Sequence, residues 1–154
     1  MNDEWITIEK PQKNKNNNNK YVYKVKSFDE IKIIIIDTLC NNTIFKIPSY
    51  IYIYGSRARN KEKIDSDIDM MIFWKYPYPS YDELNLYKNK LKLKLNLNID
   101  FVCMFITNKI IKITDEKTKC YYENVIVDAI CIYPQNNKNL LIDLIDFSIK
   151  LQKI

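Results

Sequence analysis

The sequence predicts an α/β (α+β) domain built on a small mixed β-sheet flanked by helices, and three observations support this. Short apolar runs rich in Ile, Tyr and Phe, typical of buried strands, alternate with amphipathic stretches typical of helices. Two of these stretches begin with a capping box, Ser27 with Glu30 and Ser80 with Glu83. At 154 residues and without internal repeats, the chain can bury one core without disulfides or a metal.

The first twenty residues are predicted to form a flexible polar arm, residues 1–20, ahead of a single domain, residues 21–154. Lys10–Lys20 consists almost entirely of Asn and Lys and lacks the apolar side chains that offset the entropy of ordering. In the first part of the domain the pattern predicts a short strand, a capped helix, a buried strand, and a turn with a short helix. These elements are expected at Tyr21–Lys26, Phe28–Leu39, Tyr50–Tyr54 and Gly55–Asn60.

The stretch Leu84–Asn98 fits two periodicities. Its leucines alternate with Lys and Asn from residue 91 to 97 as in a strand, but its apolar side chains also form a helical face. The capping box that begins at Ser80 favours a helix to about Lys94. The other elements are expected as strands at Asp67–Trp74, Leu97–Met104 and Ala129–Tyr133 and helices at Thr118–Val127 and Leu140–Lys153, with Ile110–Ile113 unassigned.

The composition excludes several kinds of site. The chain has no histidine, which removes histidine-based catalytic triads and the usual zinc sites, and its four cysteines form no CxxC pair. Without a secretory leader we expect an intracellular, cytoplasmic protein with reduced cysteines; AT-rich codon usage would also fit a virus-infected cell. No apolar run approaches the roughly 20 residues of a membrane span, so we expect no membrane contact. A net charge of +5 permits a polyanionic partner but does not require one.

The single glycine of the chain, Gly55, directly follows the expected strand Tyr50–Tyr54. Glycine lets the backbone turn with positive φ and lets a ligand approach where a Cβ would block it. Ser56 adds a hydroxyl, and both arginines of the chain follow as Arg57 and Arg59. The guanidinium fork suits phosphate oxygens. The pattern indicates a phosphate-binding turn, and the alternative is a tight strand–helix turn with two surface arginines.

Three aspartates form the second part of the pattern. Asp67 and Asp69 are two residues apart on an expected strand, so both carboxylates project from one side of the sheet. Such a pair is repulsive unless a cation lies between, and hard oxygen ligands suit Mg²⁺. Asp100 lies between aliphatic neighbours on another expected strand, where a charge is costly unless it is paired or binds metal. The alternatives are an exposed acidic turn for the pair and a lysine salt bridge for Asp100.

Together these residues spell G-S-x10-D-x-D over strand, turn, helix and strand, with an isolated strand aspartate further along. The segments YIYIYGSRARN, SDIDMMIFW and NIDFVCM resemble the minimal nucleotidyltransferases of the DNA-polymerase-β-like superfamily. These small domains are similar to the core of kanamycin nucleotidyltransferase and to antitoxins that adenylylate partner toxins. The resemblance covers about residues 28 to 133 and implies a polymerase-β-like nucleotidyltransferase core.

The resemblance also implies a role for each motif residue. Gly55 and Ser56 would hold the β- and γ-phosphates of a nucleoside triphosphate. Asp67 and Asp69 would hold two Mg²⁺ (or Mn²⁺) ions, and Asp100 would complete the ion that activates the acceptor hydroxyl. Asp100 could also take the acceptor proton. The implied activity is transfer of a nucleoside monophosphate, AMP from ATP by preference, to a hydroxyl of a protein or RNA.

Arg57 and Arg59 are expected to bind the nucleotide as well, Arg57 at the phosphates. Asn60 stands where relatives often have glycine, and asparagine tolerates the left-handed backbone expected there. Only 54 residues follow Asp100, which leaves little room for an added acceptor-binding domain. The sequence therefore leaves the acceptor undetermined, together with the base preference.

Two other functions compete with an active enzyme. One is a catalytically inactive regulatory module that binds nucleotide or a partner, against which the presence of all three carboxylates argues. The other is an RNA-binding domain, since the Tyr and Lys side chains of Tyr21–Lys26 could stack on and steer a single strand. Both a homodimer and a complex with a partner protein stay open.

Overall fold

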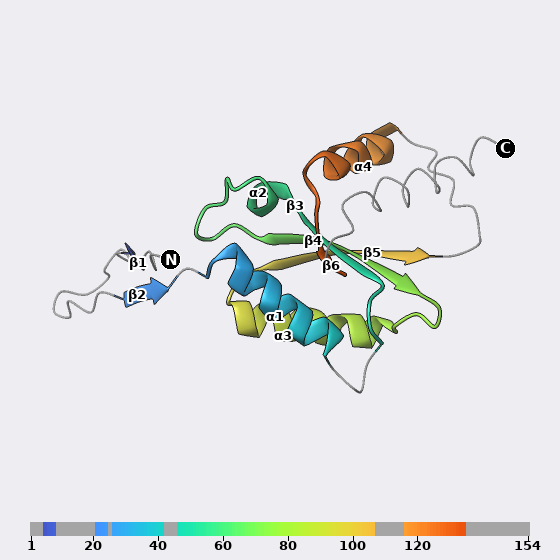
Figure 1. The fold of residues 1–154 in the computed structure, drawn as a ribbon, viewed down its shortest axis with the longest axis horizontal. Helices are drawn as coiled ribbons and strands as arrows, with labels where there is room; N and C mark the ends of the chain where they lie inside the picture. The colour runs from blue at the N-terminus through green and yellow to red at the C-terminus, as the bar shows by residue number, and fades with distance from the viewer. Residues whose placement is uncertain (1–4, 9–20, 25, 42–45, 107–115, 135–154) are drawn as a thin grey trace.

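The computed structural model describes residues 5–8, 21–24, 26–41, 46–106 and 116–134 (Figure 1). Its elements follow in the order β1 (Trp5–Ile8), β2 (Tyr21–Lys24), α1 (Phe28–Cys40), β3 (Tyr50–Tyr54), α2 (Gly55–Ala58), β4 (Ile68–Lys75), α3 (Tyr81–Leu95), β5 (Ile99–Ile106), α4 (Glu116–Asp128) and β6 (Ile130–Tyr133). No helix in these ranges is long and apolar enough to cross a bilayer.

Four strands form the central sheet, in the order β5-β4-β3-β6. β4 and β5 run parallel and are joined through helix α3, as parallel neighbours require. β3 runs antiparallel to both β4 and β6. Because of these directions, the end of β3 and the beginnings of β4 and β5 lie at the same edge of the sheet. The predicted α/β class with a small mixed sheet is confirmed.

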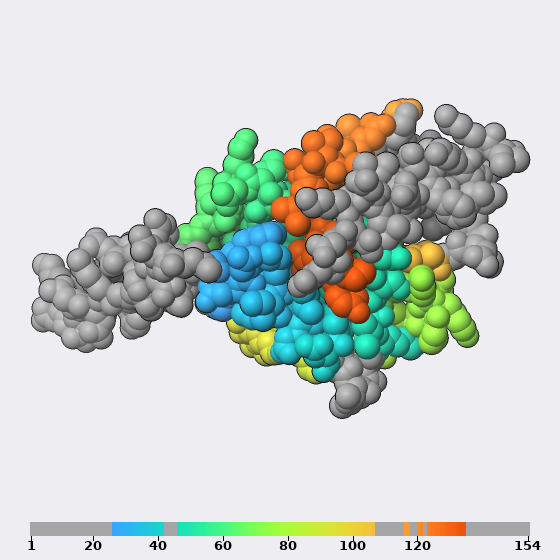
Figure 2. All heavy atoms as spheres, viewed as in Figure 1, coloured from blue at the N-terminus to red at the C-terminus, as the bar shows by residue number. Residues whose placement is uncertain are grey.

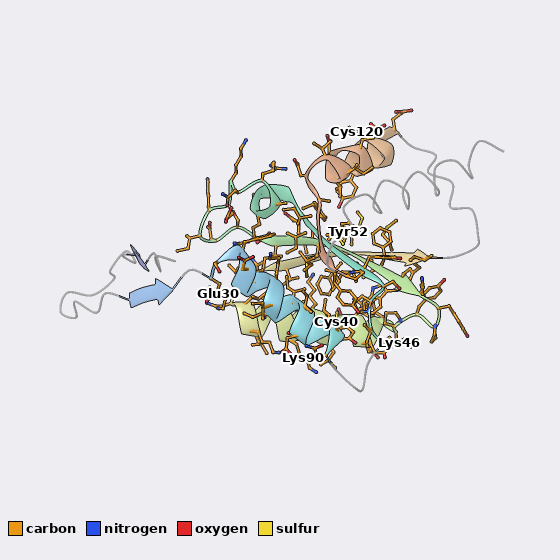
Figure 3. All side chains as sticks on the ribbon, viewed as in Figure 1. Glu30, Cys40, Lys46, Tyr52, Lys90 and Cys120 are labelled. Carbon is orange, nitrogen blue, oxygen red and sulfur yellow. The ribbon has the colours of Figure 1, made fainter. Side chains whose placement is uncertain are left out.

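Helices cover both faces of this sheet. Figure 1 shows α1 and α3 together on one side and α4 on the other, and side chains fill both layers between (Figure 3). The α1/α3 layer contains the larger buried cluster, which includes Trp74, Tyr87 and Leu91. The α4 layer is smaller and consists of Tyr52, Tyr54, Met71, Phe73 and Val125. Burial on both faces explains why β3 and the Met70–Trp74 part of β4 are continuous apolar runs instead of alternating ones.

Both predicted capping boxes are present. The hydroxyl oxygen of Ser80 accepts a hydrogen bond from the Glu83 backbone N–H (3.2 Å), and the Ser80 N–H donates to the Glu83 carboxylate (2.6 Å). Ser27 and Glu30 form the same pair of bonds at the start of α1. Each box satisfies two backbone N–H groups that the start of the helix would otherwise leave unpaired. The caps therefore fix where both helices of the larger layer begin.

The ambiguous stretch after Ser80 is helical, as the cap predicted. Leu91 and Leu95 are buried, whereas Leu93 between them is 83% exposed, so burial follows the helical spacing of four and not the strand spacing of two. The helix ends at Asn96, which adopts a left-handed conformation with φ 54°. This C-cap and the turn after it shift the next strand, expected at Leu97–Met104, to Ile99–Ile106.

The N-terminal prediction is wrong at four residues. Trp5–Ile8 forms strand β1, which pairs antiparallel with Tyr21–Lys24, although residues 1–20 were expected to be a flexible arm. Trp, Ile and Thr favour strands, and the arm prediction rested on the polar run that follows them. Residues 9–20 lie outside the described ranges. So do the unassigned segment Ile110–Ile113 and the helix expected at Leu140–Lys153.

We expect Ser80→Ala to lower the free energy of unfolding by about 1 kcal/mol, because it removes the side-chain acceptor of the α3 cap. Chemical denaturation measures this loss. Asn85→Ala, at an exposed position of the same helix, is the matched control and should cause no loss. Equal stabilities of the two variants would contradict a stabilising role for the cap.

Candidate active site

The motif residues meet at the sheet edge where β3 ends and β4 and β5 begin. Asp69 pairs with Asp100 across the parallel strands, and on its other side it pairs with Tyr54 at the end of β3. Side chains of directly paired residues project from the same face of a sheet. Asp67, two residues before Asp69, completes the acidic cluster, defined here as Asp67, Asp69 and Asp100. The register thus brings together two carboxylates that are separated in the sequence by a strand and a helix.

Gly55 lies against this cluster. Its φ is +76°, in the left-handed region, where a residue with a side chain is strained. A Cβ at this position would overlap the Asp69 carboxylate oxygen and lie 3.2 Å from its Cγ. The predicted requirement for glycine is therefore explained by two causes, the turn and the close approach of a carboxylate. Ser56, partly exposed, follows at the start of α2.

Arg57 points into the protein. Its side chain is 5% exposed, Nη2 donates to the Ser66 carbonyl (2.6 Å) and Nε to the Asp67 carbonyl (3.3 Å). These two bonds tie α2 to the segment that leads into β4. Arg57 thereby holds the backbone from which the Asp67 and Asp69 side chains project. A phosphate contact through its remaining N–H groups stays a prediction.

Arg59 has a different partner. Its Nη1 lies 2.7 Å from the Asp128 carboxylate at the end of α4, and both side chains are partly exposed. This ion pair links α2 to α4, which lie side by side on the surface (Figure 2). The sequence contained no signal for it, because 69 positions separate the two residues. The expected contact between Arg59 and a nucleotide stays a prediction.

Electrostatics at the cluster favour a cation. Burial raises the pKa of the Asp69 carboxyl above its ordinary value, and the negative charges of Asp100 and Asp67 raise it further, whereas Arg59 and Arg57 oppose the shift. Within the described part of the chain, no lysine or arginine lies within ion-pair distance of any of the three carboxylates. The structural alternative for Asp100, a lysine salt bridge, thus has no support among the described residues.

The cluster does not by itself form a complete metal site. Among the described residues, no three Cys, Asp or Glu side chains are gathered closely enough to hold an ion. Mg²⁺ is commonly bound by only one or two carboxylates, with water and substrate phosphates as its other ligands. The donor set therefore fits a cation that arrives with a triphosphate better than one that is held permanently. The assignment of the three aspartates as metal ligands stays a prediction.

A pair of tyrosines at the cluster was missed by the sequence analysis. The hydroxyl oxygens of Tyr54 and Tyr121 lie 2.6 Å apart, with the rings edge to face. Burial and this hydrogen bond raise the pKa of Tyr54, and the charges of Asp69 and Asp100 add to the shift. The only sequence signal was that Tyr54 directly precedes Gly55. Because Tyr54 also continues the alternating tyrosines of the strand, the same pattern is equally typical of a core side chain. Tyr121 could not be placed before the position of α4 was known.

We expect Gly55→Ala to destabilise the protein more than Asn60→Ala does. Both variants place alanine at a left-handed backbone, with φ 76° and 57° in the parent, but the strain of about 1–2 kcal/mol is new only at Gly55, because Asn60 already has a Cβ. Only at Gly55 would the new methyl group also displace the Asp69 carboxylate. The difference between the two free energies of unfolding measures the new backbone strain and the collision together, and equal losses would contradict both.

We expect Arg57→Lys to lower the free energy of unfolding by about 2 kcal/mol, because one ammonium group does not reproduce two hydrogen bonds from a rigid fork. Arg59→Lys is the matched control, since it keeps a charge beside Asp128 in a partly exposed pair and should cost less than about 1 kcal/mol. Denaturant titrations of both variants test this. A small and equal loss of unfolding free energy in both variants would mean that Arg57 does not hold the Ser66–Asp67 segment.

Comparison with solved structures supports the fold. A toxin–antitoxin structure with AMP-PNP matches at TM-score 0.55 and 19% identity over 79% of this chain and 90% of that chain. A tri-AMPylated Shewanella oneidensis HEPN toxin in complex with MNT antitoxin matches at TM-score 0.51 and 18% identity, over 81% and 89%. Another Shewanella oneidensis structure matches at TM-score 0.52 and 15% identity, over 82% and 91%. At these identities the likeness concerns the fold alone.

A search of curated proteins finds no match. The family model described as "Polymerase beta, Nucleotidyltransferase" matches residues 34–138, a range that includes β3, β4, β5 and the acidic cluster. This range is more than half of the chain and contains the glycine turn and all three aspartates singled out from the sequence. The chain belongs to the polymerase-β-like nucleotidyltransferase family.

Proposed function

We propose that this protein transfers AMP, or another nucleoside monophosphate, from the triphosphate to a hydroxyl group of a protein or RNA acceptor. The observation that carries the proposal is the pairing of Asp69 with Asp100 directly beside the Gly55 turn. This arrangement brings a backbone turn suited to phosphates against carboxylates that lack a cationic partner among the described residues. Membership of the nucleotidyltransferase family supports the reaction class.

The residues present fit Mg²⁺ or Mn²⁺. Asp69 is partly buried with a raised pKa beside two further carboxylates, an arrangement that a bound divalent cation would relieve. Asp67, Asp69 and Asp100 would hold the ion or ions, together with phosphate oxygens. When bound, divalent cations neutralise the triphosphate and lower the pKa of the attacking hydroxyl.

The protein's own groups account for the rest of the reaction. Gly55 and Ser56 would seat the β- and γ-phosphates, and Arg57 would keep the Asp67–Asp69 segment in place through its two carbonyl contacts. The acceptor oxygen forms a bond to the α-phosphorus, and the bond from that phosphorus to pyrophosphate breaks. Asp100, which is exposed, would take the proton of the hydroxyl.

A protein is the favoured acceptor. The solved neighbours include a toxin–antitoxin with AMP-PNP and an AMPylated HEPN toxin in complex with an MNT antitoxin. The present chain covers about nine-tenths of each of those chains, so the likeness extends over almost their whole length. By analogy, a hydroxyl side chain of a separate partner protein would receive the nucleotide, and RNA is the alternative acceptor.

We expect Asp100→Asn to abolish transfer without unfolding the protein. In EDTA the variant should be as stable as the wild type or slightly more stable, because asparagine keeps the shape and removes one of three like charges. Mg²⁺ with ATP should stabilise the wild type, by about 2.7 kcal/mol at a hundredfold excess over Kd, and the variant far less. Thermal unfolding in EDTA and in Mg²⁺ with ATP measures both effects.

Labelled ATP incubated with a cell lysate and the protein then tests transfer and shows whether label enters protein or RNA. A loss of about 3–5 kcal/mol for Asp100→Asn in EDTA would reveal a buried salt bridge and contradict the carboxylate site. Nucleotide binding without transfer to any acceptor would indicate the inactive regulatory module instead. No response of the wild type to ATP with Mg²⁺ or Mn²⁺ would exclude both.

A further inference from the structure

The tyrosine pair at the acidic cluster is more than a packing contact. Tyr54 ends β3, and Tyr121 lies on α4, 67 positions later, yet their hydroxyl oxygens are 2.6 Å apart. The ring centroids are 6.3 Å apart, with an angle of 87° between the planes. This contact turns the Tyr121 hydroxyl toward the same side of the sheet as the acidic cluster.

The register places Tyr54 level with the carboxylates. Tyr54 pairs with Asp69, and Asp69 pairs with Asp100, so the three side chains share one face and one edge of the sheet. Tyr54 also directly precedes Gly55, the turn proposed to hold the phosphates. The charges of both Asp69 and Asp100 act on the Tyr54 phenol, which supports their nearness. A hydroxyl bonded to Tyr54 is therefore beside the place where the α-phosphate would lie.

The two tyrosines differ in access. Tyr54 is 8% exposed, whereas Tyr121 is 38% exposed. After this contact, the C-terminal part of α4 is anchored by the buried Val125 and by the Arg59–Asp128 ion pair. Tyr121 thus combines a nucleophilic group, a hydrogen bond that orients it, and an opening to solvent through which a nucleotide can approach. These are the requirements for an acceptor hydroxyl.

We propose that Tyr121 is a site of self-modification, at which the protein transfers a nucleoside monophosphate to its own phenol oxygen. The inference rests on the proposed function. The Tyr121 oxygen forms a bond to the α-phosphorus of the triphosphate, the bond to the pyrophosphate leaving group breaks, and the phenol proton passes to Asp100. Tyr54 is a positioning residue that holds the acceptor oxygen through the hydrogen bond.

The product would regulate the same site. A phosphodiester on Tyr121 adds a negative charge and a nucleoside beside the acidic cluster, and it leaves the Tyr121 oxygen without a proton to donate to Tyr54. The negative phosphodiester would repel the negative charges of a second triphosphate at the site. Self-modification would therefore slow further transfer until the group is removed.

The test uses the purified full-length chain with labelled ATP and Mg²⁺ and no other protein or RNA. Intact mass should rise by one adenylyl group in the wild type, and fragmentation of the tryptic peptide that begins at Cys120 should place the group on Tyr121. Tyr121→Phe, which keeps the ring, should lose the label, and Asp100→Asn should lose it too. Tyr81→Phe, at a 77% exposed tyrosine on α3, is the matched control and should keep it.

Label that persists in Tyr121→Phe, or that maps to another residue of the wild type, would overturn the proposal. If Tyr121→Phe does not fold, as judged by its thermal unfolding, the peptide map of the wild type decides alone. An unlabelled chain in a lysate where another protein or RNA becomes labelled would reject self-modification and leave the proposed function standing. Absence of label everywhere, with no pyrophosphate released, would reject both.

Discussion

The parallel pairing of β4 with β5 sets the geometry of the whole site. Asp69 lies opposite Asp100 in this register, and the antiparallel pairing of β3 adds Tyr54 to the same row. A slip by one residue would turn one carboxylate to the opposite face of the sheet. Burial of β4 on both faces, against the α1/α3 layer and against the α4 layer, prevents such a slip. The hydrophobic core therefore specifies the position of charged side chains that it does not contain.

The fold holds the carboxylates of the acidic cluster near one another although their negative charges repel. Asp69 is partly buried beside two like charges, and the arginines that act on it do so without direct contact. Because Gly55 has no Cβ, the Asp69 carboxylate can lie against it. Arg57 holds the backbone before β4 from inside the protein, through its bond to the Ser66 carbonyl. Arg57, expected from the sequence to bind phosphate, thus has a structural role in this fold. Strain of this kind is typical of functional sites, where a ligand of opposite charge relieves it.

Helix α4 packs on the face of the sheet from which the acidic cluster projects. Two polar contacts join it to the motif region, Arg59 with Asp128 and Tyr121 with Tyr54. Both contacts start from residues close to Gly55 in the sequence, so a change in the position of α4 would also change the surroundings of the Gly55 turn. If the proposed transfer takes place, α4 is the helix closest to the acidic cluster on this face of the sheet.

The sequence by itself determined most of the elements and singled out the candidate residues of the site. Caps at Ser27 and Ser80, apolar runs in β3 and β4, and the rarity of Gly and Arg are local signals, so they predicted helices, strands and the Gly55–Asp69 motif. Strand β1 was missed because a polar run beside it dominated the local composition. The tertiary structure decided what depends on contacts between distant segments: the inward direction of Arg57, the partner of Arg59, and the meeting of Tyr54 with Tyr121. Side chains that are 67 and 69 positions apart leave no periodicity in the sequence, because only the packing of α4 on the sheet brings them together.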